Sequence, residues 1–171
     1  QITVHLREDR RHIQDADVYA LRERITGRLN LEMANAPEIV RIAMDVKPDE
    51  VCLVPEKRRE LTTEGGLDVA GQAAALAKSV GALCERGIAV SLFVEPDRNQ
   101  LAAAAGVGAQ FVELHTGTFC NAQGEDARRE LRRLIEGARF AAEHGLRVNA
   151  GHGINLSNID AVLDIPHMDT L

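Results

Sequence analysis

The most constraining feature of the sequence is a strand-then-helix rhythm that repeats along the chain. Six short apolar segments have the pattern of strands, and a stretch with helical spacing of apolar residues follows each one. The predicted strands are residues 2–6, 29–33, 51–55, 88–94, 110–115 and 146–150, and the longest predicted helix covers residues 125–144. Because every connection contains a helix, the strands are expected to pair in parallel.

Polar side chains recur at the carboxyl ends of these predicted strands. They are His5, Arg7, Glu32, Glu56, Glu95, Glu113, His115 and His152. In a (β/α)8 barrel, sites are built from the carboxyl ends of the strands. The predicted fold is therefore an α/β TIM (β/α)8 barrel. An open doubly wound sheet is the alternative, but no G-x-G-x-x-G follows any strand.

Composition limits the class of protein. A chain of 171 residues with 45% apolar content can bury one sizeable core, which indicates a single domain. The net charge of -6 argues against a general nucleic-acid or membrane-surface binder and favours small anionic partners. Three cysteines without metal-type spacing, and no secretory or long apolar segment, indicate a cytoplasmic protein. The cysteines, Cys52, Cys84 and Cys120, are interpreted as packing or surface residues.

The histidines and glutamates at the strand ends are candidates for proton transfer near neutral pH. His5, His115 and His152 carry imidazoles, which work in both directions of transfer, and Glu32 and Glu113 are their carboxylate neighbours. Each is equally interpretable as a hydrogen-bonded structural group, and either glutamate as a partner that orients a histidine. The pattern alone does not separate these roles.

Metal binding and phosphate binding are further interpretations of the residues at these strand ends. His and Glu on neighbouring strands can ligate a metal, but neither His-x-His nor H-E-x-x-H is present. Arg7 with Arg10, Arg11 and His12 could bind phosphate, or could form a solvated basic turn. Residues 62–66, T-T-E-G-G, could also bind phosphate through charge and backbone N–H groups, or could be part of an ordinary loop. They lie within a predicted long mobile loop over residues 56–71. The glycines of G-H-G at 151–153 allow a ligand to approach the backbone closely, although helix packing is an alternative reason for them.

Six longer strings make a resemblance specific. They are T-V-H-L-R-E-D-R-R-H-I (3–13), N-L-E-M-A (30–34), C-L-V-P-E-K-R (52–58), T-T-E-G-G-L-D-V (62–69), F-V-E-L-H-T-G (111–117) and V-N-A-G-H-G (148–153). In this order, they resemble the pyridoxine 5'-phosphate synthase family. The resemblance implies a TIM barrel with added helices and a homo-oligomer, commonly an octamer. It also implies condensation of 1-deoxy-D-xylulose 5-phosphate with 3-amino-2-oxopropyl phosphate, giving pyridoxine 5'-phosphate, phosphate and water, without a cofactor or a metal.

The resemblance also implies roles for individual residues. The catalytic set would be His5 as proton acceptor, Glu32 as second general base, Glu113 as transition-state stabiliser and His152 as proton donor. The phosphorylated substrates would be held by Arg7, His12, Thr62 and Gly153. Arg7, His12 and Thr62 would contact the deoxyxylulose phosphate, and Gly153 the phosphate of the amino ketone. The family assigns no role to His115.

The sequence departs from the family pattern at both ends. The family's first strand with its N-x-D-H motif and its last strand with a G-H pair are absent, so a barrel without its first and last strands is expected. The chain is accordingly interpreted as one barrel domain over residues 1–171, an internal portion of a longer chain. Two other classes stay open: another phosphate-handling barrel enzyme, such as an isomerase or metal-dependent lyase, and a non-catalytic scaffold.

Overall fold

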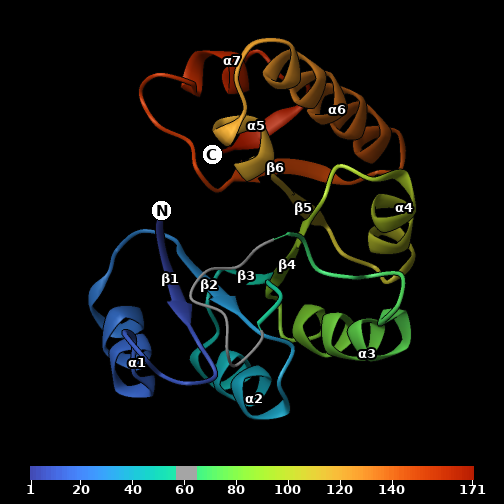
Figure 1. Cartoon of the computed structure of the whole chain (residues 1–171). Coiled ribbons are helices and arrows are strands. Elements are labelled where there is room, and N and C mark those ends of the chain that lie inside the picture. The colour runs from blue at the N-terminus through green and yellow to red at the C-terminus, as the bar shows by residue number, and fades with distance from the viewer. Residues whose placement is uncertain (57–64) are drawn as a thin grey trace.

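The computed structural model describes residues 1–56 and 65–171 and shows one curled sheet of parallel strands with helices along its outer side (Figure 1). The strands are β1 (Ile2–Leu6), β2 (Leu29–Met33), β3 (Glu50–Leu53), β4 (Ala89–Val94), β5 (Phe111–His115), β6 (Arg147–Gly151) and β7 (Met168–Thr170). Their order in the sheet is their order in the chain, and each pairs in parallel with the next. The predicted parallel, barrel-type α/β fold is confirmed.

The helices lie in the connections between strands. They are α1 (Asp15–Arg24), α2 (Pro37–Val46), α3 (Ala73–Cys84), α4 (Arg98–Gly106), α5 (Gly117–Asn121), α6 (Gly124–Glu143) and α7 (Ile159–Leu163). Local sequence explains where several begin. Pro37 opens α2, where a missing N–H costs nothing, and the Asp97 carboxylate caps α4 by accepting from the N–H groups of Asn99 and Gln100. None of the described helices is both long and apolar enough to cross a membrane.

Two elements were not predicted from the sequence. Helix α5 has five residues, which is too few for a helical pattern of apolar residues to appear. Strand β7 has three residues, of which Asp169 and Thr170 are exposed, so it has no alternating pattern either. Its extended conformation depends on pairing with β6, where Val148 opposes Met168 and Asn149 opposes Thr170. The described chain thus has seven strands rather than six.

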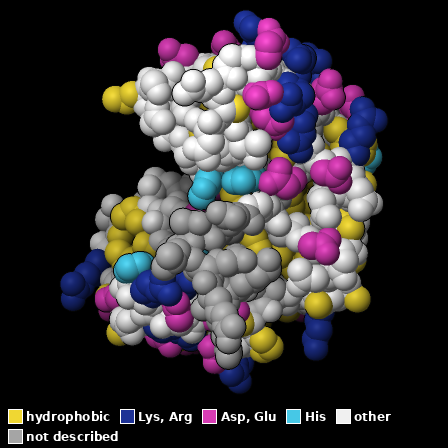
Figure 2. Space-filling view, viewed as in Figure 1, with side chains coloured by type: hydrophobic (Ala, Val, Ile, Leu, Met, Phe, Trp, Pro, Cys, Tyr) yellow, Lys and Arg dark blue, Asp and Glu magenta, His cyan; other side chains and the backbone are white. Residues whose placement is uncertain are grey.

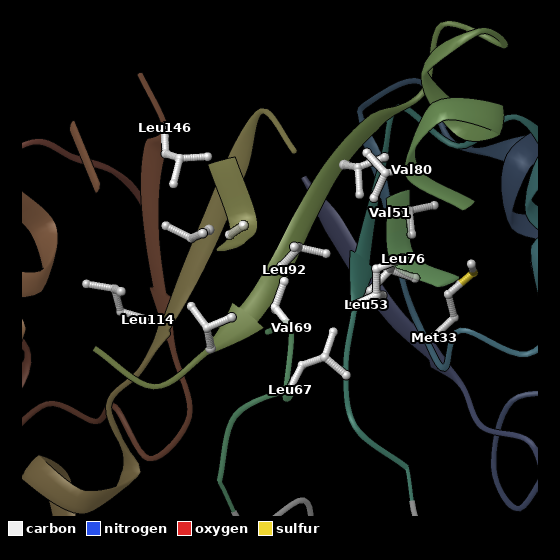
Figure 3. Close-up of a cluster of buried hydrophobic side chains, with 14 of the residues drawn as sticks. Met33, Val51, Leu53, Leu67, Val69, Leu76, Val80, Leu92, Leu114 and Leu146 are labelled. Atoms are coloured by element: carbon white, nitrogen blue, oxygen red, sulfur yellow. The ribbon is translucent and has the colours of Figure 1, made fainter. Parts of the chain in front are cut away.

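The core lies between the sheet and the helices. Figure 3 shows Val51 and Leu53 of β3 and Leu92 of β4 packed with Leu76 and Val80 of α3. All five side chains are at most 1% exposed. Apolar residues at this density on parallel strands are expected where helices cover one face and the barrel interior covers the other. This packing holds the strand ends, and the polar groups on them, in fixed positions.

The segment predicted as a mobile loop is partly built into this core. Residues 57–64 of it, including Thr62, lie outside the described residues. Beyond them, Leu67 and Val69 are buried, and the Leu67 N–H donates to the Phe93 carbonyl at 2.7 Å. The Val69 N–H donates to Oε1 of Gln100 at 2.7 Å. The prediction of a mobile loop is therefore wrong for Leu67 and Val69, because their side chains are buried in the core beside β4 and α4.

The sheet curls without closing within the described residues. Strand β1 pairs only with β2, and β7 only with β6. Figure 1 places both termini on the open side of the curl, and Ile2 on the edge strand β1 is 43% exposed.

Candidate active site

Two adjoining cavities lie inside the curled sheet, and the smaller one is at the carboxyl ends of its strands. Their volumes are about 290 and 230 Å³, and Glu32, Glu113 and His152 line both. His5 lines the smaller cavity together with Phe93. Figure 2 shows histidine side chains gathered at the inner end of a hollow that opens at one side of the molecule. The structure therefore brings together the four residues that the sequence analysis named as catalytic.

His5 is held between two carboxylates. Strands β1 and β2 pair so that His5 lies beside Glu32, whose Oε2 is 3.8 Å from His5 Nδ1. On the other side of the ring, Nε2 is 2.7 Å from Oε1 of Glu56, which follows β3. Burial by itself would raise the pKa of Glu56, but the hydrogen bonds from His5 and from the Glu8 N–H outweigh it, so this pKa is lowered. An ionised Glu56 accepts a hydrogen bond from the Nε2–H group of His5, which leaves Nδ1 facing Glu32.

Glu113 is the most perturbed carboxyl group of the site. Burial, with the nearby charges of Glu32 and Glu50, raises its pKa to about 7, although a hydrogen bond from Cys52 opposes the rise. The Cys52 thiol donates to Oε2 of Glu113 at 3.7 Å, and burial raises the pKa of this thiol well above its ordinary value. A carboxyl group with this pKa is present in both protonation states near neutral pH. It can therefore give and accept protons.

The backbone at His152 is held in place by Thr116, which directly follows β5. It directly follows β6 and has a φ of 85°, an uncommon conformation for a residue other than glycine. The Thr116 hydroxyl lies 2.7 Å from the carbonyl oxygen of Gly151 and 2.6 Å from that of His152. The Thr116 N–H also donates to the Gly151 carbonyl at 3.0 Å. These contacts stabilise the strained turn that presents the imidazole to the cavities.

A metal site needs several ligating side chains that converge on one point. No group of three or more His, Cys, Asp or Glu side chains among the described residues is arranged as metal ligands would be. The carboxylates and imidazoles pair with one another instead, as His5 does with Glu56 and His115 with Glu95. A carboxylate in such a pair can orient the imidazole and select its tautomer.

The sequence as a whole matches one family model, described as "Pyridoxal phosphate biosynthesis protein PdxJ", over residues 1–171. The chain belongs to the PdxJ family. It is 56% identical over 170 residues to the pyridoxine 5'-phosphate synthase of Parasynechococcus marenigrum, covering 99% of this chain and 68% of the relative. It is 52% identical to the enzyme of the same name from Aliivibrio fischeri, covering 98% of this chain and 69% of the relative. Membership of the family identifies the chain as a biosynthetic enzyme.

Solved structures with low sequence identity support the fold. The deoxyribose phosphate aldolase from Aeropyrum pernix matches with a TM-score of 0.61 at 18% identity, covering 94% of this chain and 78% of the aldolase. A mutant of the tryptophan synthase alpha-subunit from Pyrococcus furiosus matches with a TM-score of 0.58 at 15% identity, covering 92% and 60%. Both are TIM barrels. The PdxJ chain thus has the strand order and curl of that fold.

The predicted phosphate-binding residues are less closely grouped than the catalytic ones. Arg7 directly follows β1, and its Nε donates to Oδ1 of Asp9 at 3.1 Å. His12 is exposed on the segment between β1 and α1, and neither residue lines the two cavities. Gly153 follows His152 with a φ of 79° and packs against Cys120 of α5. Thr62 lies outside the described residues.

Sequence reasoning missed the hydrogen-bond partners of the residues at the strand ends. Glu56 and Glu95 were recognised as strand-end carboxylates, but no pattern linked them to His5 and His115. Cys52 was interpreted as packing, and it is buried, but its thiol also faces Glu113. The only available signal was the position of each residue at or just beyond the end of a strand.

Proposed function

We propose that this chain carries the acid–base centre of a pyridoxine 5'-phosphate synthase. In the proposed reaction, 1-deoxy-D-xylulose 5-phosphate condenses with 3-amino-2-oxopropyl phosphate to give pyridoxine 5'-phosphate, inorganic phosphate and water. The observation that carries the proposal is the convergence of His5, Glu32, Glu113 and His152 on adjoining cavities of a PdxJ-family chain. Relatives with more than half of their aligned residues in common bear the same name.

The chemistry of the reaction explains the need for several acid–base groups. Joining two phosphorylated ketones into an aromatic ring requires imine formation, loss of water, loss of phosphate and ring closure. Protons must leave or arrive at several different atoms, and each well-placed acid–base group contributes roughly 10² to 10⁴ in rate. Because reactants and products are at the same oxidation level, side chains can catalyse these steps without a redox cofactor.

His5 is proposed to accept a proton through Nδ1. Glu56 engages Nε2 at 2.7 Å and thereby selects the tautomer that keeps Nδ1 unprotonated in the neutral ring. The distance of 3.8 Å between Nδ1 and Glu32 is too long for a hydrogen bond. A reacting group of the substrate placed between them would meet two bases at once, which suits Glu32 as the second general base.

Glu113 and His152 are proposed to act on the opposite side of the cavities. With a pKa of about 7, Glu113 can hold a proton against a developing oxyanion and release it afterwards. His152 is exposed to the same space and is proposed as the proton donor. The separation of donors on β5 and β6 from acceptors on β1 and β2 allows protons to be taken and delivered at different atoms.

The phosphate groups are proposed to bind at the edges of this centre. Arg7 lies two residues beyond His5 along the same strand direction, and its guanidinium suits a phosphate. Gly153 follows His152 and is proposed to meet the phosphate of the amino ketone through its backbone. His12 and Thr62 complete the proposed set on the side of the deoxyxylulose phosphate. A single barrel domain over residues 1–171 and a homo-oligomer, octameric by resemblance, are proposed with it.

The deciding experiment measures inorganic phosphate release by the purified chain, with both proposed substrates together, with each alone, and with a chelator present. A second form, extended at both ends to the length of the relatives, is assayed in parallel. Release that requires both substrates and survives the chelator supports the proposal. Release that the chelator abolishes would favour a metal-dependent barrel enzyme, and no release from either form would contradict the synthase assignment.

A further inference from the structure

The side chain of His115 is buried beside the proposed site but lines neither cavity. It is 8% exposed, at the last position of β5, and its Nδ1 is 2.7 Å from Oε1 of Glu95. Glu95 directly follows β4. The hydrogen bond from His115 is the main cause that lowers the pKa of Glu95, and the charge of Arg133 and the Gly66 N–H add to it. Since an ionised carboxylate only accepts, Nδ1 of His115 must donate.

The other side of the His115 ring faces His152. Their ring centroids are 5.1 Å apart with the planes tilted by 60°. A β-carbon on Gly117 would lie 2.5 Å from Nε2 of His115 and 2.7 Å from Cδ2 of His152, so this glycine leaves the space in which the two rings meet. Phe93 closes the group, with its centroid 5.1 Å from that of His115 and 6.4 Å from that of His152.

Three consecutive residues therefore support the turn that contains His152. His115 packs on the imidazole of His152, Thr116 contacts the carbonyls of Gly151 and His152, and Gly117 leaves room for both rings. His152 is otherwise exposed, on a backbone with positive φ. A side chain in that situation has few contacts of its own to limit its rotation, so the buried neighbour must supply the constraint.

We propose that His115 and Glu95 are a positioning pair that holds the His152 imidazole in the orientation from which it serves the cavities. Glu95 anchors the His115 ring, and the His115 ring in turn limits the rotation of His152. The inference rests on the proposed function of His152 as proton donor. Neither His115 nor Glu95 touches the substrate in this arrangement, so their effect is transmitted through His152.

The groups around His152 come from several elements, and the test must separate them. The titratable or charged groups that share a cavity with it or contact its partner are His5 of β1, Glu32 of β2, Glu95 after β4, Glu113 and His115 of β5, and Arg133 of α6. Glu95→Gln changes one of them without altering its shape. His115→Phe keeps a ring of similar size and removes the hydrogen bond, and Glu95, 32% exposed at its side chain, can then be solvated.

The experiment combines kinetics of the form that releases phosphate with NMR of the purified chain labelled with ¹⁵N-histidine. We expect Glu95→Gln and His115→Phe to lower kcat by roughly tenfold with KM unchanged, and to shift the ring signals of His152. Glu95→Asp, which keeps the charge, should recover part of the loss. Glu136→Gln on the exposed face of α6 is the matched control and should behave as wild type.

Two results would overturn the positioning role. One is unchanged His152 ring signals and unchanged kcat in Glu95→Gln. The other is a loss of unfolding free energy that accounts for the lost activity in both variants, since the pair would then be structural only. If no form releases phosphate, the proposed function fails, but the ring signals still decide whether Glu95 and His115 orient His152.

Discussion

The carboxylate of Glu113 occupies the space in which a β-carbon on Gly151 would lie. The two residues are on the paired strands β5 and β6, where Gly151 lies opposite His115. Because residue 151 has no side chain, the side chain of Glu113 can lie in the barrel interior against β6. Its burial there is the main cause of its raised pKa. One glycine thus permits both the position and the protonation behaviour of a proposed catalytic group.

Replacing Gly151 with Ala should displace Glu113. The added methyl group overlaps the carboxylate, and overpacking of this kind costs about 1–3 kcal/mol of unfolding free energy. Turnover should fall as well, because the carboxyl group leaves its position. Denaturant unfolding and steady-state rates measure the two effects. Gly81→Ala, in the middle of α3 with open space around it, is the control and should stabilise the protein by about 0.5–1 kcal/mol. Equal behaviour of both variants would contradict the prediction.

Ionisation of Glu113 should make the fold less stable as the pH rises from about 5 to 8. The folded state keeps the proton up to a pKa of about 7, whereas the unfolded state releases it near 4.5, so the folded state binds more protons in this interval. The contribution to the free energy of unfolding is on the order of 3 kcal/mol. Glu113→Gln should remove it, which unfolding curves of both proteins at pH 5 and pH 8 would show. A variant with the same pH dependence as wild type would refute the assignment.

His152→Asn and Glu32→Gln should each lower turnover by roughly tenfold or more without unfolding the protein, as expected for a lost acid–base group. Both side chains line the cavities and are partly accessible, so neither change leaves a buried void. Glu85→Gln at the exposed end of α3 is the control. Phosphate release and circular dichroism check activity and fold. Wild-type rates in both variants would rule out the proposed catalytic set.

The pair of His5 and Glu56 should stabilise the fold above the ordinary pKa of a glutamate. Although burial opposes it, hydrogen bonds from His5 and the Glu8 N–H lower the pKa of Glu56 in the folded state. Its contribution is therefore present above pH 4.5 and is lost as the pH falls through the lowered value. Glu56→Gln should lower stability at pH 7 and weaken the loss of stability on acidification. A parallel fall in both proteins below pH 4.5 would show that Glu56 contributes nothing.

The same variant should also disturb catalysis. A glutamine at position 56 can donate to Nε2 of His5 as well as accept from it, so it no longer selects one tautomer. We expect kcat to fall by roughly tenfold, with a change in the ¹⁵N signals of the His5 ring. Unchanged signals and rate would mean that Nδ1 of His5 does not depend on Glu56.

The sequence was sufficient to predict the elements and their pairing. Alternating and helical patterns are local, and they place β1 to β6 and the main helices within a few residues of their observed bounds. The same patterns place His5, Glu32, Glu113 and His152 at strand ends, which parallel pairing gathers at one edge of the sheet. The exceptions, α5 and β7, are too short to carry a pattern, and the apolar residues Leu67 and Val69 belong to the core rather than to a mobile loop.

Only the tertiary structure decided how these residues are paired. His5 bonds to Glu56 across 51 residues, His115 to Glu95 across 20, and Cys52 faces Glu113 across 61. These contacts depend on the curl of the sheet and on the rotation of each side chain. Neither can be predicted from the alternating or helical pattern of apolar residues. The raised pKa of Glu113 likewise arises from burial by a neighbouring strand. The sequence determined which groups reach the end of the barrel, and tertiary packing determined which of them pair with one another and which line the cavities, because burial and hydrogen-bond geometry exist only in the folded chain.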